Sequence, residues 1–177
     1  MRTILIVSTT GMGDCLWATP GIRALKKSFP NAAIDLLIQP QWKSLYFKNP
    51  HIRKVIFYQP QWYRQLNLLP RLLGTYYNHV LIFHCNKDIG RLIRCLRSEE
   101  ILAHQNLPNI LDDKILKFSQ TTHPILRRAA ILEKLGVEMD GTQMEIFFND
   151  KDRTEVISFL NQNQMNAKEF VYFNVGA

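Results

Sequence analysis

A short loop near the N-terminus has the residue types and spacing of a ligand-binding turn. Gly11 and Gly13 let the backbone turn sharply and approach a ligand closely, and Asp14 follows directly. A carboxylate at a helix N-terminus stays ionised because free N–H groups and the helix dipole favour the anion. Such an anion can accept a proton from a substrate hydroxyl within hydrogen-bond reach. Asp14 is therefore a candidate general base, and the alternative from spacing alone is a helix N-cap.

Other polar candidates follow the expected ends of strands and starts of helices. The apolar run 79–84 predicts a strand that ends at His84, and ligands of open α/β sheets bind at the carboxyl ends of strands. The alternative there is an ordinary helix start with a satisfied histidine, and for His123, before Pro124, it is a capping role. The candidate substrate-binding residues are Thr10, Gly11, Met12, Gly13, His84, Asn86, Lys87, Arg91 and His123.

Several other kinds of site are not favoured by the sequence. A dinucleotide fingerprint needs Gly or Ala where Leu16 stands, and Asp35 lies inside an expected strand instead of at its end. A phosphate-binding P-loop is excluded because the sequence lacks Gly-Lys-Ser/Thr. The five histidines and three cysteines show no metal-binding spacing, so we expect no metal site and no bound cofactor.

Apolar runs and turn residues predict alternating strands and helices. A doubly wound, Rossmann-like parallel sheet of the α/β class follows from this alternation. We expect residues 105–120 to be irregular and the helix near Pro70 to kink or break. The expected strands are 3–8, 33–38, 54–58, 79–84, a weak 101–103, 144–148 and 170–175, and the expected helices are 14–29, 41–47, 61–77, 87–97, 124–135 and 151–163.

Composition bounds the class of protein and its partners. A chain of 177 residues with 46% hydrophobic residues is expected to form one globular domain. The formal net charge of +7 favours anionic partners. The scattered basic residues, Arg127 and Arg128 among them, are expected on solvated helix faces, and the alternative is a patch that faces a phosphate. The sequence has no apolar stretch of membrane-span length and no signal peptide. Three cysteines, an odd number without metal-binding spacing, favour reduced thiols in a cytosolic protein.

The segment from Ile4 to Lys27 resembles the start of a known family, the ADP-heptose:lipopolysaccharide heptosyltransferases of glycosyltransferase family 9. Similar matches follow in order along nearly the whole chain and are densest in residues 4–58. The matching motifs are Gly11-x-Gly13-Asp14, Ala18-Thr19-Pro20, Ala24-Leu25-Lys26, Phe29–Asp35, Asn49–Val55, His123, Leu132–Gly136 and Val175-Gly176-Ala177.

This resemblance implies one half of a GT-B enzyme with two facing Rossmann-like domains. Residues 1–170 would form the acceptor-binding domain, and 171–177 would be the first strand of a donor-binding domain that this chain lacks. The implied reaction is an inverting, metal-independent transfer with Asp14 as the base. The acceptor would be the lipopolysaccharide core or a related glycan, reached in the cytoplasm with peripheral contact at the inner membrane. An ADP-heptose-like donor would bind the second domain, so this half alone is expected to be inactive.

Three other functions remain open at this point. A non-catalytic Rossmann-like module could bind a phosphorylated glycan or a protein. A nicotinamide-dependent oxidoreductase domain is disfavoured by Leu16 and by the position of Asp35. A nucleic-acid binder is disfavoured because aromatic residues near basic ones come without an RNA-binding motif, so we expect no nucleic-acid partner.

Overall fold

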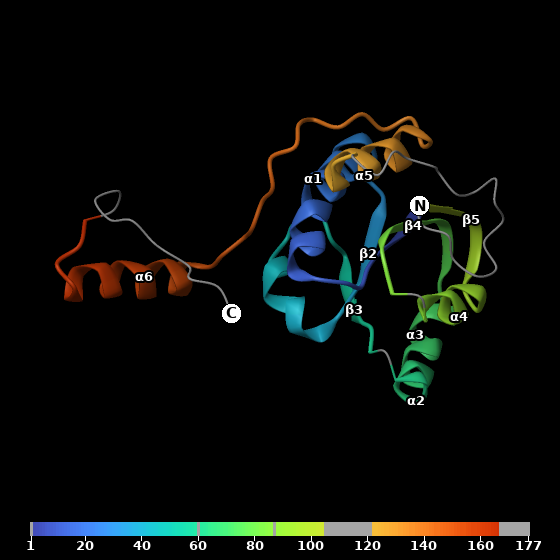
Figure 1. Cartoon of the computed structure of the whole chain (residues 1–177), viewed down its shortest axis with the longest axis horizontal. Helices are drawn as coiled ribbons and strands as arrows, with labels where there is room; N and C mark the ends of the chain where they lie inside the picture. The colour runs from blue at the N-terminus through green and yellow to red at the C-terminus, as the bar shows by residue number, and fades with distance from the viewer. Residues whose placement is uncertain (1, 60, 87, 105–121, 167–177) are drawn as a thin grey trace. The chain divides into compact units, whose positions relative to one another are not determined.

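The computed structural model describes residues 2–59, 61–86, 88–104 and 122–166. Its contacts divide the chain into two units, Met1–Ile146 and Phe147–Ala177. The expected strand 170–175, the expected start of a second domain at 171–177 and the expected irregular segment 105–120 lie outside the described residues. Figure 1 traces the elements of the first unit around its sheet.

Within the described residues, five strands form one all-parallel sheet in the order β3-β2-β1-β4-β5. The switch from one direction of winding to the other falls between β1 and β4, so the predicted doubly wound Rossmann-like sheet is confirmed. The elements are β1 Thr3–Ser8, α1 Met12–Ser28, β2 Ala33–Ile38, the 3-10 helix η1 Pro40–Tyr46, β3 Lys54–Phe57, α2 Trp62–Gln65, η2 Leu66–Leu68, α3 Leu69–Leu73, β4 Tyr76–His84, α4 Ile89–Arg94, β5 Arg97–Ala103, α5 Pro124–Glu133 and α6 Asp150–Gln162.

Both faces of the sheet are buried, as the continuous apolar strands require. In β1, Ile4 and Ile6 pack on the side covered by α1 and α5, and Leu5 and Val7 pack on the side of α3 and α4. Helices α1 and α5 also pack against each other, and Figure 1 shows them together over one face. Polar side chains can therefore reach water mainly at the strand ends and on the outer sides of the helices.

Two predicted elements differ from the structure. The helix expected at 61–77 is broken into α2, η2 and α3, so the break expected near Pro70 is confirmed, but the expected end of the helix is wrong. Strand β4 begins at Tyr76, and Tyr77 is buried with its hydroxyl donating to the Asp35 carboxylate over 3.0 Å. The strand expected at 144–148 pairs with no described strand. Its backbone is held instead by side chains, since the Glu145 N–H donates to the Thr19 hydroxyl over 3.1 Å. The other described elements match their expected positions within a few residues, except that β5 is longer than the weak strand expected.

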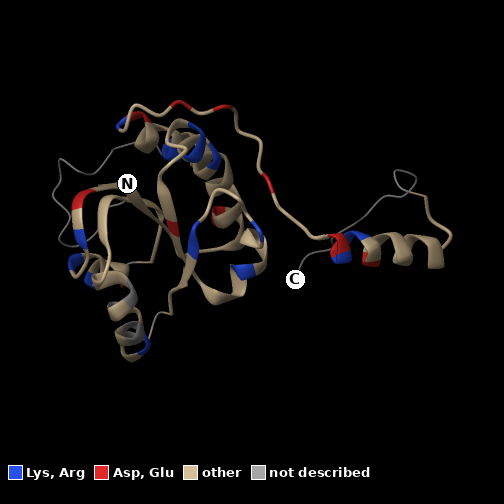
Figure 2. Ribbon diagram, turned by 180° about the vertical axis from the view of Figure 1, so that it is seen from behind, with Lys and Arg blue, Asp and Glu red and all other residues tan. Residues whose placement is uncertain are grey.

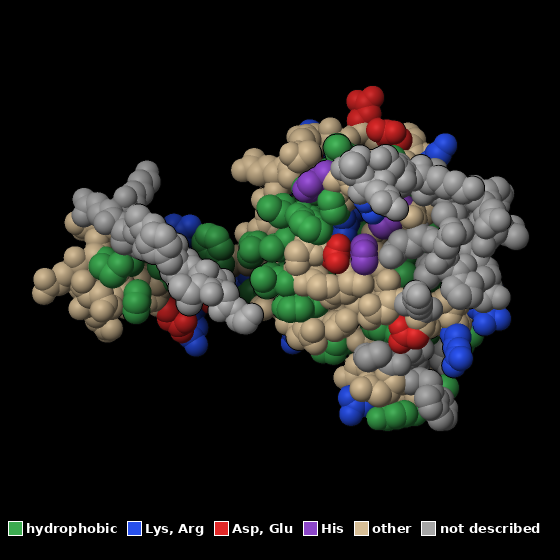
Figure 3. All heavy atoms as spheres, viewed as in Figure 1, with side chains coloured by type: hydrophobic (Ala, Val, Ile, Leu, Met, Phe, Trp, Pro, Cys, Tyr) green, Lys and Arg blue, Asp and Glu red, His purple; other side chains and the backbone are tan. Residues whose placement is uncertain are grey.

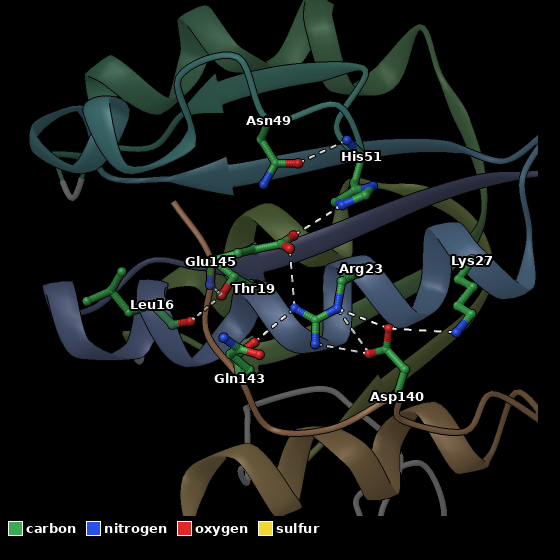
Figure 4. A network of polar contacts seen from close by, with 9 residues as sticks. All are labelled: Leu16, Thr19, Arg23, Lys27, Asn49, His51, Asp140, Gln143 and Glu145. Carbon is green, nitrogen blue, oxygen red and sulfur yellow. Dashed lines mark hydrogen bonds and ion pairs between the residues drawn. The ribbon is translucent and has the colours of Figure 1, made fainter. Parts of the chain in front are cut away.

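Pro20 lies inside α1, next to Thr19, which contacts Glu145. Pro20 has no N–H to give to the carbonyl of Leu16, one turn earlier. The hydroxyl of Thr19 donates to that carbonyl over 2.8 Å and accepts from the Glu145 N–H (Figure 4). The Thr19 side chain therefore satisfies the helix carbonyl that Pro20 leaves free, and it also binds the segment that follows α5.

Ion pairs fasten the same segment, residues 139–146, along α1. The Arg23 guanidinium donates to Asp140 at 3.1 Å and to Glu145 at 3.3 Å, and His51 lies 3.1 Å from the other Glu145 oxygen (Figure 4). Lys27 is farther out, 4.0 Å from Asp140 and 72% exposed. Arg23 is thus the centre of the network, and we call residues 139–146 the strap.

Basic side chains are spread over the described residues. In the part of the chain drawn in colour in Figure 2, Lys and Arg lie on several different elements. The second unit contains α6, which begins with a reciprocal capping box between Asn149 and Asp152. None of the helices in the described residues is both long enough and apolar enough to cross a lipid bilayer.

We expect the substitution Arg23→Met to loosen the strap. Losing the charged hydrogen bonds should raise the exchange rate of the Glu145 amide proton by about tenfold, which corresponds to about 1.4 kcal/mol. Hydrogen exchange followed by NMR measures this directly. Lys27→Met is the matched control and should leave the rate near the wild-type value, because exposed ion pairs contribute little. Equal rates in both variants would show that Arg23 does not hold the strap.

Candidate functional site

Asp14 lies in the first turn of α1, at the carboxyl end of β1. The helix begins at Met12 with Gly11 as its N-cap, so the N-cap alternative for Asp14 is wrong. Gly11 is extended at the cap, with φ −74° and ψ 169°, and a Cβ there would meet no atom within 4 Å. The Asp14 side chain is 18% exposed, so its carboxylate is largely enclosed yet still reaches the surface.

The loop before Asp14 is held by side chains from the ends of neighbouring strands. Gln39 donates to the Thr9 carbonyl over 2.6 Å, and the indole N–H of Trp42 donates to the Thr10 carbonyl over 2.8 Å. Asn86, which follows β4, donates to the Thr9 carbonyl over 3.3 Å. These bonds take up carbonyls of a backbone that lies outside regular structure, so the loop is fixed before any ligand arrives.

Arg128 of α5 is the partner of Asp14 that the sequence analysis missed. Its Nη2 donates to the Asp14 Oδ1 over 3.0 Å and to the Asp14 main-chain oxygen over 3.2 Å. The residue is 1% exposed, so its expected place on a solvated helix face is wrong. The buried positions of α5 are Ile125, Arg128, Ile131 and Leu132. This helical spacing was the available signal, because it puts an arginine in an apolar stripe.

A β-bulge turns His84 toward Asp14. The register of β1 against β4 shifts at the end of the strands, so that Ser8 pairs with His84 and Phe83 is passed over. Phe83 packs on the α1 side of the sheet, and His84 also lies on that side, with its Nδ1 3.7 Å from the Asp14 Oδ2. Regular alternation would have sent His84 to the other face. The bulge therefore brings a titratable ring to the carboxylate.

The charges around Asp14 keep it ionised. Burial raises the pKa of Asp14, but the Thr10 hydrogen bond of 2.7 Å, the His84 ring and the Arg128 guanidinium together hold that pKa below its usual value. Burial lowers the pKa of His84, with smaller contributions from Arg128 and Arg127, against an opposing effect of Asp14. At neutral pH the site therefore combines a carboxylate, a neutral imidazole and a buried guanidinium.

Aromatic and imidazole rings lie near Asp14 and Arg128. The Trp17 ring meets His123 edge-on at 5.6 Å, and the Arg128 guanidinium lies 6.0 Å from the Trp17 ring centroid. The ring centroids of His84 and His104 are 6.0 Å apart. Figure 3 shows an acidic side chain beside a histidine on one face of this unit, next to hydrophobic side chains. Such a surface offers apolar stacking as well as polar contacts.

The structure gathers some of the predicted substrate-binding residues and separates others. Thr10, Gly13 and His84 adjoin Asp14, while Met12 is 50% exposed at the helix start. Asn86 holds the loop, and His123 caps α5 by accepting from the Ile125 N–H over 3.3 Å, so the capping alternative is confirmed for it.

Two further candidates are not placed at the carboxylate. Arg91 is exposed on α4, and no described contact joins it to Asp14. Lys87 lies outside the described residues. These two residues thus stay predictions without support from the site's geometry.

The described residues also bear on two other kinds of site, a metal site and a dinucleotide site. Among the described residues, no group of three or more His, Cys, Asp or Glu side chains is placed to hold a metal ion. Asp35, the candidate ribose-binding acid, is fully buried, and its carboxylate is paired with Arg53 at 2.8 Å and Lys54 at 3.2 Å. Its oxygens are thus occupied inside β2, which agrees with the sequence argument against a dinucleotide site.

The sheet order, the bulge and the enclosed carboxylate at the strand ends define a Rossmann-like α/β domain with a preorganised acidic site. No family model matches the sequence, and no curated protein matches it. Solved structures do match. The glycosyl transferase family 9 protein from Veillonella parvula DSM 2008 aligns with a TM-score of 0.80 and 18% identity, over 99% of this chain and 54% of that one.

Two Escherichia coli heptosyltransferases match as well. ADP-heptose LPS heptosyltransferase II aligns with a TM-score of 0.66 and 13% identity, covering 95% of this chain and 52% of that one. Heptosyltransferase WaaC with ADP-2-deoxy-2-fluoro heptose aligns with a TM-score of 0.64 and 17% identity, covering 81% and 51%. The predicted resemblance to glycosyltransferase family 9 is thus confirmed at the level of fold, and the chain spans about half the length of these proteins.

We expect Asp14→Ala to destabilise the protein. The substitution leaves the Arg128 guanidinium buried without its carboxylate, which should lower the free energy of unfolding by about 3 kcal/mol. The double variant Asp14→Ala/Arg128→Met removes both charges and should recover most of that loss. Urea unfolding of wild type, both single variants and the double variant measures the coupling. Additive effects would mean that the two side chains do not act as a pair.

A pH-dependence follows from His84. Because its pKa lies below the ordinary 6.5, the unfolded chain binds this proton more tightly than the folded protein does. Its contribution to stability is therefore present above pH 6.5 and is lost as the pH falls through the folded pKa. In Asp14→Asn the carboxylate no longer favours the imidazolium, so the pKa of His84 should fall further. Imidazole NMR titration measures the His84 pKa in both proteins, and urea unfolding at several pH values measures the loss of stability. A higher His84 pKa in the variant would contradict the expected effect of Asp14.

Proposed function

We propose that this chain is the acceptor-side half of an inverting glycosyltransferase of the GT-B, heptosyltransferase-like type. The observation that carries the proposal is the ionised carboxylate of Asp14, held at the carboxyl end of β1 by Thr10 and Arg128. The position fits the rule that open α/β sheets bind their ligands at this edge. The fold shared with family 9 glycosyltransferases supports the same assignment.

Asp14 would act as the general base in the transfer. An acceptor hydroxyl donates a hydrogen bond to the carboxylate, which takes the proton as the hydroxyl oxygen attacks the anomeric carbon of the donor. The bond from that carbon to the diphosphate breaks, and the nucleoside diphosphate leaves with the electron pair. One bond is formed and one broken at a single carbon, so the sugar inverts.

The acceptor would lie against the residues around Asp14. Thr10, Gly11, Met12 and Gly13 present the loop to it, and His84 stands beside the carboxylate. The net charge of +7 suits an anionic acceptor such as the lipopolysaccharide core or a related glycan, and it suits peripheral contact with the cytoplasmic face of the inner membrane. These residues supply positioning and a proton acceptor, which are needed on the acceptor side of the reaction.

The donor would bind a second domain. The chain spans about half the length of the matching structures, which supports a division of labour between two halves. Charge that develops on the leaving diphosphate needs N–H or cationic donors. In this proposal a separate domain, whose first strand begins near 171–177, supplies them to an ADP-heptose-like donor, and this half alone does not catalyse transfer.

The experiment is a turnover assay of the two-domain protein of this proposal, called the intact protein below, with ADP-heptose and a truncated core saccharide. Asp14→Asn keeps the shape of the side chain and should lower kcat by at least about a hundredfold, as expected for the loss of a general base. Asp140→Asn, in the strap, is the matched control and should retain turnover. Normal turnover by Asp14→Asn would refute the base assignment, and acceptor binding without turnover in the wild type would favour the non-catalytic module.

A further inference from the structure

The Arg128 guanidinium is enclosed but incompletely paired. Its Nη2 makes two bonds to Asp14, whereas Nε and Nη1 are buried without a hydrogen-bond partner among the described residues. In the described part of the site Asp14 is the carboxylate that faces it, and the Trp17 ring lies near one face of the guanidinium. Among the described residues the cation is thus paired with one anion and lies beside an aromatic ring.

Such an arrangement is a poor way to stabilise a fold. Removing a guanidinium from water is costly, and a buried ion pair replaced as a whole by apolar side chains often leaves a protein as stable or more so. The neighbours of Arg128 along the buried stripe of α5 are Ile125, Ile131 and Leu132, so a methionine would suit the same position. Packing therefore does not explain why a cation stands there.

The contacts with Asp14 do explain it. Arg128 takes Oδ1, and the Thr10 hydroxyl donates to Oδ2, so the two oxygens have different partners. The further bond to the Asp14 main-chain oxygen fixes the first turn of α1 relative to α5. The carboxylate is thereby held in one rotamer, with Oδ2 beside His84.

We propose that Arg128 is a positioning residue that fixes the Asp14 carboxylate in one orientation and selects Oδ2 as the oxygen that receives the acceptor proton. Arg128 itself need not touch the acceptor. Its catalytic consequence rests on the proposed function, whereas its hold on Asp14 is a property of the 177-residue chain and can be measured there.

The first arm is a titration of the Asp14 carboxyl by carbon-13 NMR. Among the described residues, Thr10, His84 and Arg128 act on this carboxylate, which in turn raises the pKa of the neighbouring Cys15 thiol. Arg128→Met should raise the pKa of Asp14 by about one unit, a tenfold increase in proton affinity, and the double variant Asp14→Ala/Arg128→Met should unfold at a temperature close to that of the wild type. Arg128→Lys should restore part of the shift.

Arg127→Met is the matched control on the same helix. Its Nε donates to the Thr122 carbonyl, and Arg127 is not among the groups that shift the pKa of Asp14, so the Asp14 titration should stay as in the wild type. An unchanged titration in Arg128→Met would overturn the proposal. So would a lowered unfolding temperature with an unchanged Asp14 pKa, because that is the result for a residue that only supports the fold.

The second arm is the kinetics of the intact protein. Arg128→Met should lower kcat at least tenfold with little change in KM, and the acid limb of its pH profile should move to higher pH, with partial rescue by Arg128→Lys. Wild-type turnover with an unaltered profile in Arg128→Met would overturn the positioning role. A wild type that transfers no sugar would refute the proposed function alone, since the titration arm does not depend on it.

Discussion

The burial of the parallel sheet on both faces is the constraint on which the rest of this structure depends. Strands β1, β2 and β4 carry apolar side chains toward α1 and α5 on one side and toward α3 and α4 on the other. Water and polar ligands can then approach the sheet only at the strand ends. Chemistry on this fold is concentrated where β1 and β4 end, and Asp14 lies in the first turn of α1 at that point.

A loop at this edge must be rigid if it is to hold a catalytic group, and this one is fixed by side chains instead of by regular secondary structure. Gln39, Trp42 and Asn86 bond to its carbonyls from the segments that follow β2 and β4. Arg128 reaches the same turn from a helix that lies more than a hundred residues later in the chain. Preorganisation of this kind reduces the rearrangement needed when a reacting group binds.

Much of the fold could be predicted from the sequence, because long apolar runs report burial on both faces. The strands at 3–8 and 33–38 coincide with β1 and β2. The strand expected at 144–148 failed for a physical reason, since an apolar pattern does not specify a hydrogen-bonded neighbour. The strap meets the side of α1, where Thr19 and Arg23 bind it.

The site was predictable only in part. Asp14 and its glycines are visible in the sequence because they are consecutive, whereas their partners come from distant elements. The sequence signal for Arg128 is its place in the apolar stripe of α5, whereas residue type alone predicts that an arginine lies on the solvated face of a helix. His84 was identified as a strand end, yet its direction depends on a bulge that alternation alone does not reveal.

The central claim is that Asp14 receives a proton from the acceptor, and a structure of the intact protein with acceptor and an unreactive donor analogue tests it most directly. The account requires an acceptor hydroxyl oxygen about 3 Å from the Asp14 Oδ2, on the side away from Arg128. It also requires the anomeric carbon of the donor to lie in line with that oxygen. An acceptor bound in a reactive position with all of its hydroxyls beyond hydrogen-bond reach of Asp14 would contradict it.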